Sequence, residues 1–380
     1  MILMAFYIPE PVFKYSFELD TGVFLSRVAP AMFSASLGLN TDLLFPGVFD
    51  NNIYLSYSLE YDGPGVKDTP EMGFQDRYQN HEISVVYSTP VTTFDFAIGP
   101  SISVEYYRAG RNEAWTTGIY NYYRFGFDSF LKGYRWKATL SGYYFDYPNQ
   151  LELSEAIASL GTSTVSAEKA VASRNNFSLL GSYQRVLKDF VLTPSFYFAI
   201  YPWQPVIGED GRYSSTPQVD FSISTSGYLA RENEFKTRST VFMASGTFFF
   251  SNQAYFSAPA TSMFLNQTVY YPNFFSYLDF SLSFSTSFTN LSYLSVGLPL
   301  NFQVFPFRPP LKEDGTFNDS SRFVSFTAVP YVKLGIASRE FSKWFLYGSM
   351  YLNFTNSPGE SAAGYNFWGV FIGVGMEYGN

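Results

Sequence analysis

The sequence contains no cysteine and one histidine, His81. Without cysteine, disulfide bonds and thiolate metal sites are excluded. A hydrolase of the Ser-His type needs a histidine with Ser, Asp or Glu partners. No paired-carboxylate or nucleophile motif surrounds His81, which we expect at the rim of the molecule. No GxGxxG, P-loop or HExxH sequence occurs either. We therefore predict a protein that is not an enzyme and holds no cofactor or metal.

Charge and long apolar runs are also scarce. Charged residues make up 15% of the 380 residues, against about a quarter in ordinary soluble domains. The formal net charge of -8 argues against a nucleic-acid partner. The longest apolar run near the start is MILMAFYI, far short of the roughly 18 residues that a membrane-spanning helix needs.

Aromatic residues, in contrast, are abundant and are dispersed along the chain. They make up 21% of the sequence, yet the mean hydropathy is only -0.04. The segment 278–288, LDFSLSFSTSF, shows why, because apolar residues alternate with Asp or Ser. Successive side chains of a strand point to opposite faces. This segment is therefore a strand with one apolar and one polar face, as found in a soluble sandwich or in a transmembrane barrel.

The same alternation recurs from Val12 to the end of the chain. In 94–106, apolar residues keep one parity for thirteen residues, which exceeds the roughly 9 to 11 that a tilted transmembrane strand needs. Pro100 cannot donate to a strand ladder, so we expect a bulge there. The apolar parity of these strands carries no charge, as the lipid face of a barrel requires. A soluble array of sandwiches is the weaker reading.

Connections of two lengths alternate along the chain, as they do in a series of hairpins. The long connections are expected to include 108–116 and 251–273. We predict an all-β, up-and-down antiparallel barrel of about 16 strands over 12–380, with 14 strands as the alternative. The first two strands are expected at about Val12–Val28 and Ala31–Leu39. Residues 1–11 would form an N-terminal segment, either periplasmic or inside the lumen. These residues lack a basic region and a cleavage site, so we expect that a signal peptide has been removed.

This pattern resembles the bacterial outer-membrane β-barrel class, including porins, over essentially the whole chain. The final segment NFWGVFIGVGMEYGN is similar to the C-terminal assembly signal of that class, although Gly379 and Asn380 follow Tyr378. The resemblance implies an integral protein of the Gram-negative outer membrane, with short periplasmic turns and long extracellular loops. It also implies contact with lipid and lipopolysaccharide, assembly by the barrel assembly machinery through the last strand, and a homo-oligomer or an envelope protein as a further partner.

Charged residues at the strand positions that would face the lumen separate by their predicted height along the barrel axis. Asp95, Asp128 and Glu377 are exceptions, because they are acidic and are expected near the periplasmic end. We predict an acidic outer mouth and a basic inner mouth, which would favour cations and neutral polar solutes; the alternative is that the charges pair across the wall. The acidic set is Glu18, Glu60, Glu82, Glu105, Asp220 and Asp279, and the basic set is Lys14, Arg124, Arg135, Lys137 and Lys333.

Small hydroxyl residues dominate the middle of the predicted lumen face, and side chains of this size do not fill a large barrel. Water or an inward loop must occupy the space. The long loop 148–174 contains Leu153, Ile157 and Leu160 at helical spacing, and is a candidate constriction or an external cap. We predict a channel or facilitated-diffusion porin for small polar or weakly cationic solutes. The alternative is a non-transporting scaffold, adhesion or docking barrel with an occluded lumen.

Overall fold

The structure is a computed structural model. It describes most of the chain, apart from residues 1–10, residue 380 and several connecting segments. The described residues are 11–26, 32–46, 51–64, 77–108, 121–148, 175–207, 213–233, 237–252, 254–259, 266–271, 275–288, 294–305, 323–339, 342–355 and 367–379.

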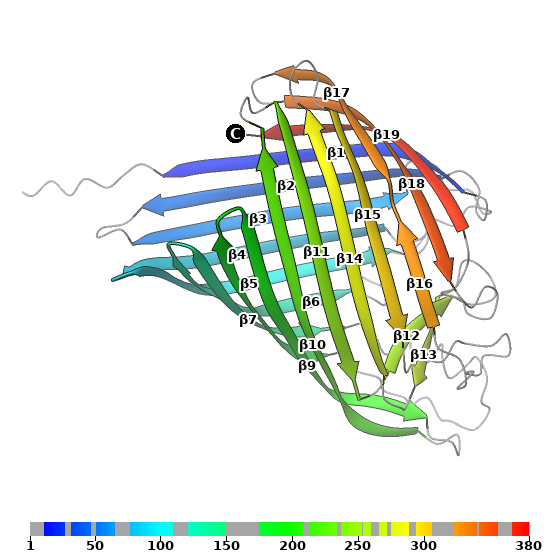
Figure 1. The fold of residues 1–380 in the computed structure, drawn as a ribbon. Coiled ribbons are helices and arrows are strands. Elements are labelled where there is room, and N and C mark those ends of the chain that lie inside the picture. Colours follow the sequence, from blue (N-terminus) through cyan, green and yellow to red (C-terminus); the bar gives the residue numbers. More distant parts are fainter. Residues whose placement is uncertain are drawn as a thin grey trace, which may run out of the picture.

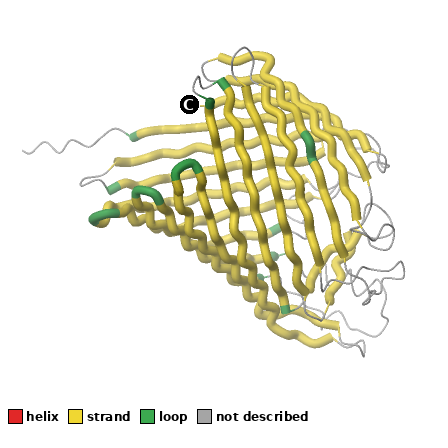
Figure 2. Tube along the Cα trace, viewed as in Figure 1, coloured by secondary structure: helices red, strands yellow, loops and turns green. Residues whose placement is uncertain are grey.

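These residues are almost entirely strand, as Figure 2 shows. No helix long and apolar enough to cross a membrane occurs in this part of the chain. The strands are β1 (Val12–Ser26), β2 (Met32–Pro46), β3 (Asn52–Pro64), β4 (Arg77–Val91), β5 (Phe94–Arg108), β6 (Tyr122–Gly133), β7 (Trp136–Asp146), β8 (Asn176–Leu187), β9 (Phe190–Ile207), β10 (Tyr213–Glu232), β11 (Arg238–Ser251), β12 (Ala254–Pro259), β13 (Asn266–Tyr271), β14 (Phe275–Phe288), β15 (Leu294–Phe305), β16 (Phe323–Ala328), β17 (Tyr331–Arg339), β18 (Ser342–Thr355) and β19 (Phe367–Gly379).

All strands except β12 and β13 form one closed antiparallel sheet (Figure 1). Strands that follow one another in this sheet pair along the chain, β11 pairs with β14, and β1 also pairs with β19, which closes the barrel. The strands β12 and β13 form a separate two-stranded sheet. The strands β16 and β17 are two parts of one barrel strand, interrupted at Val329 and Pro330, because both pair with β15 and β18. Counted this way, the described residues form 16 barrel strands, and the predicted fold and strand number are confirmed.

Short turns gather at one end of the barrel. The described examples join β4 to β5, β6 to β7 and β8 to β9. We call this the short-turn end, and the opposite end the long-loop end. The first strand starts at the short-turn end, and β19 finishes there beside it. In Figure 1 the blue and cyan strands cross behind the green to orange strands, so the two halves of the chain form opposite walls.

Several local expectations were wrong. The second strand runs to Pro46, well past Leu39. Pro100 causes no bulge, because Ser84 opposite Ser101 and Tyr87 opposite Ile98 keep one register. Register shifts occur instead between Thr216 and Gln218 and between Gly335 and Ala337. The region 251–273, expected to be a loop, contains the paired strands β12 and β13.

The alternation of the sequence places the apolar residues on the outer surface. Ile102, Ile223 and Phe280 are each about half exposed, at 47%, 51% and 50%. Ser101 and Ser103, on the opposite parity from Ile102, are buried. A water-soluble protein hides its large apolar side chains, so a continuous belt of exposed ones is typical of a lipid-facing barrel.

Candidate functional site

The lumen wall carries the candidate functional residues, and two parts of it differ. The wall from β19 through β1 to β6 is rich in carboxylates. The wall from β7 to β11 and β14 is rich in hydroxyl groups. We call them the acidic wall and the hydroxyl wall.

Four carboxylates of the acidic wall lie in one cross-strand row. Glu377 is opposite Glu18, and Glu18 and Glu60 are both opposite Gly38. Asn80 is opposite both Glu60 and Glu105. Neighbouring strands are about 4.8 Å apart, so Glu18 and Glu60 belong to backbones about 10 Å apart. We call Glu377, Glu18, Glu60 and Glu105 the acidic row.

The height of this row differs from the prediction at one position. Glu60 and Glu105 lie in the long-loop halves of β3 and β5, as expected. Glu18 lies near the middle of β1, because that strand extends from Val12 to Ser26. The row therefore climbs from mid-height at Glu18 toward the long-loop end at Glu105. The tyrosine hydroxyl of Tyr122 donates a hydrogen bond to Glu105 at 2.8 Å.

Arg124 lies next to the acidic row and not at the short-turn end, so its predicted position was wrong. The preceding loop was expected to end at Thr116, but β6 begins only at Tyr122. Arg124 is therefore close to the long-loop end, with its Nη2 atom 2.7 Å from Oε1 of Glu82. The guanidinium carbon also lies 4.4 Å from the ring centroid of Tyr143. Arg124 thus neutralises Glu82 and joins the two walls.

The other basic residues lie in the short-turn half. Lys14 is opposite Asp42 near the start of β1. Lys137 is the second residue of β7, and Arg135 is in the turn before that strand. Lys333 lies farther up the wall, where its Nζ atom is 2.6 Å from Oε1 of Glu377.

The hydroxyl wall is built from directly opposed serine and threonine residues. Thr139 and Ser182 share a hydrogen bond of 2.7 Å, and Ser195 and Ser224 share one of 2.5 Å. One strand pair farther on, β11 and β14 repeat the arrangement, with Ser245 and Ser281 at 2.7 Å. The small side chains leave this wall open to the lumen.

Asp220 and Asp279, which were predicted at the acidic mouth, lie in the hydroxyl wall, and each accepts a hydrogen bond from a side-chain amide. Gln218 donates a hydrogen bond to Asp220 at 2.9 Å, and Asp220 is buried. Asn301 donates to Asp279 at 2.9 Å. Both carboxylates lie in the long-loop halves of their strands. The candidate constriction residues Leu153, Ile157 and Leu160 lie outside the described residues, as does the N-terminal segment 1–10.

His81 lies on the outward parity of β4, opposite Leu59. Its Nδ1 atom is 3.0 Å from the hydroxyl oxygen of Tyr57. No group of three or more His, Cys, Asp or Glu side chains within the described ranges is arranged to hold a metal ion. Sequence reasoning missed the pairing of Arg124 with Glu82, since this contact depends on where β6 starts.

Comparison with known proteins gives matches at the level of structure only. No protein-family model matches the chain, and no curated protein has a matching sequence. An OmpT loop-deletion variant, an outer membrane protein of Vibrio cholerae, aligns over 98% of this chain and 100% of its own with a TM-score of 0.47 and 8% identity. OprB of Pseudomonas putida aligns over 97% and 94% with a TM-score of 0.45 and 9% identity. No substrate transfers at this level of similarity.

The geometry of the barrel indicates in which membrane the protein resides. A closed barrel with an even number of strands, an exposed apolar exterior and a polar interior is the architecture of outer-membrane barrels. The chain is an integral outer-membrane β-barrel, and its outward belt contacts lipid.

Proposed function

We propose that the protein is a channel or facilitated-diffusion porin for small polar or weakly cationic solutes. The observation that carries the proposal is the polar lumen wall of a 16-stranded barrel. Side chains as small as Ser182, Ser195 and Ser224 do not fill a barrel of this size, which leaves an aqueous path.

The charge balance of the wall supports a preference for cations. Among the described residues, Arg124 and Lys333 are both neutralised by carboxylates, at 2.7 and 2.6 Å. No ion pair within the same residues involves Glu18 or Glu60. These carboxylates set a negative potential along the acidic wall, which attracts cations and repels anions.

The loop 148–174 is proposed as the constriction that selects solutes by size. Its two ends emerge from β7 and β8, at the edge of the hydroxyl wall. Deletion of 150–173 is expected to raise single-channel conductance. An unchanged conductance would assign the loop to an external cap.

The proposal includes no enzymatic activity, cofactor or metal. His81 supports this, because its ring lies on the outward parity beside Tyr57 and away from the lumen carboxylates. Assembly would use the last strand, whose outward side chains Trp368, Ile372 and Val374 are exposed and apolar. A homo-oligomer or a docked envelope protein remains part of the proposal, as the resemblance suggests.

The test is single-channel recording of the detergent-refolded chain in a planar bilayer under a salt gradient. A heat-modifiable gel shift first verifies that the barrel has folded. Stable steps with a cation-favouring reversal potential are expected. An anion-favouring potential would retain the channel and overturn the charge argument. Silence from a folded barrel would overturn the proposal and favour an occluded scaffold.

A further inference from the structure

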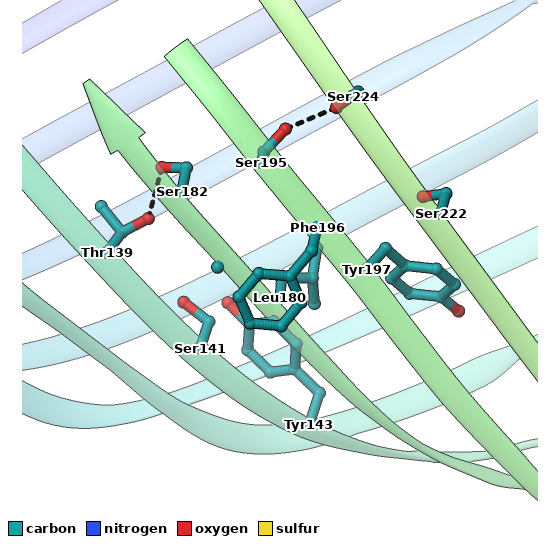
Figure 3. Close-up of a pocket in the computed structure, with 11 residues that line it drawn as sticks. Thr139, Ser141, Tyr143, Leu180, Ser182, Ser195, Phe196, Tyr197, Ser222 and Ser224 are labelled. Carbon is teal, nitrogen blue, oxygen red and sulfur yellow. Dashed lines mark hydrogen bonds between the residues drawn. The ribbon is translucent and has the colours of Figure 1, made fainter. Parts of the chain in front are cut away.

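A recess of about 420 Å³ lies in the hydroxyl wall, on β7 to β10. Figure 3 shows its lining residues as sticks. Two adjacent cross-strand rows form most of it. Thr139, Ser182, Ser195 and Ser224 make up the first row, and Ser141, Leu180, Tyr197 and Ser222 make up the second.

The recess contains many hydrogen-bonding groups and no formal charge. Its lining includes no Asp, Glu, Lys or Arg. A hydroxyl has one donor and two acceptor lone pairs, so the bonded pair Thr139–Ser182 still offers a donor and several acceptor sites. The pair Ser195–Ser224 does the same. A ligand rich in neutral groups that both donate and accept would match this surface.

One edge of the recess is held in place by charged residues of the neighbouring strand β6. Asp128 accepts hydrogen bonds from the hydroxyls of both Ser141, at 2.6 Å, and Tyr143. Arg124 lies over the ring of Tyr143 from the side of the acidic wall. These contacts fix two lining side chains, which lowers the entropy that binding would otherwise cost.

The recess also has an apolar part. Leu180 projects into the lumen with 37% of its surface exposed, among the hydroxyl groups. Ligand sites combine apolar surface with a few placed polar groups, and a volume of this size is within their usual range. A pyranose ring carries both features, since its C–H faces are apolar and its rim bears hydroxyls.

We propose that this recess is a binding subsite for a neutral sugar or a similar cyclic polyol. The inference deepens the proposed channel function and rests on it for the biological role, since a subsite in the wall would hold a solute during passage. The recess would favour a neutral sugar over an anionic one, because neutral hydroxyls offer no countercharge and the acidic wall faces it.

The experiment measures sugar binding directly and separately from conductance. Saturation-transfer NMR on the folded full chain in deuterated detergent would compare glucose, glucosamine and glucuronate, which have the same pyranose ring and differ in charge. The variants are Tyr197→Phe and the double variant Ser195→Ala/Ser224→Ala. The matched control is Ser245→Ala/Ser281→Ala, which removes an equivalent hydroxyl pair outside the recess.

We expect glucose to bind more tightly than glucuronate. We also expect the recess variants to weaken glucose binding roughly 2- to 10-fold, the usual effect of losing a hydrogen bond, while the control leaves it unchanged. Tyr197→Phe provides the answer if the double serine variant does not fold.

Equal loss in the control variant, or no saturation transfer to glucose, would overturn the subsite. A barrel that conducts ions but shows no sugar binding would overturn this inference alone. A barrel that binds glucose but conducts nothing would overturn the proposed channel and leave the subsite standing.

Discussion

The two walls of the lumen differ in the range over which their side chains act. Glu18 and Glu60 of the acidic row belong to strands about 10 Å apart, and they act on a solute through a long-range field. Hydroxyl pairs such as Ser195–Ser224, at 2.5 Å, act only on a solute in contact. The difference shows how one barrel separates two tasks: one wall would set charge preference and the other would recognise shape.

The largest effect is expected from reversing charge on the acidic wall. Glu18→Lys with Glu60→Lys replaces two negative charges by two positive ones on one row. The cation-to-anion permeability ratio should fall on the order of tenfold and invert, since a charge at 4 Å is worth about 1 kcal/mol even in water. Reversal potentials under a salt gradient measure it. Persistence of the wild-type ratio would show that ions are selected elsewhere.

Salt concentration should separate the walls with an effect of intermediate size. The Debye length falls from about 30 Å at 0.01 M to about 3 Å at 1 M. Cation preference should therefore decline severalfold over this range, because the acidic row acts through a field. Glucose binding at the hydroxyl wall should stay constant, because it uses neutral contacts. Parallel decline of both quantities would contradict the division into two walls.

The smallest effect is expected at the contact between the walls. Arg124→Gln removes the positive charge beside Glu82, whose side chain is 35% exposed. Cation preference should rise by about twofold. Arg124→Lys serves as the control, because it keeps the charge near Glu82 and should keep the preference. A fall in preference with Arg124→Gln would mean that Glu82 does not face the ion path.

The fold was predictable because its information is local. The alternation of 278–288 alone assigns Phe280 to one face and Ser281 to the other, and the structure exposes Phe280 to the exterior at 50%. The spacing of turn signals then gives the strand number. The hairpin β12–β13 was missed, since its six-residue strands are too short to show a clear alternation.

The candidate site was less predictable because it depends on register. The parity of Glu60 can be read from the sequence, but its alignment with Glu18 requires the pairings of β1, β2 and β3. Arg124 shows the limit, as an error of a few residues in the start of β6 moved it to the wrong end. The recess also escaped notice, because it needs the register of four strands.

The pairing of β1 with β19 has a consequence for biosynthesis. All the other strand pairs of the barrel join segments that are close in the chain, whereas the pair β1–β19 brings Phe17 opposite Tyr378. Loops this long are slow to close, and an unpaired strand edge attracts other chains until it is covered. Both free edges therefore have to be shielded until the last strand is in place, and a chain truncated before Phe367 would leave them permanently open.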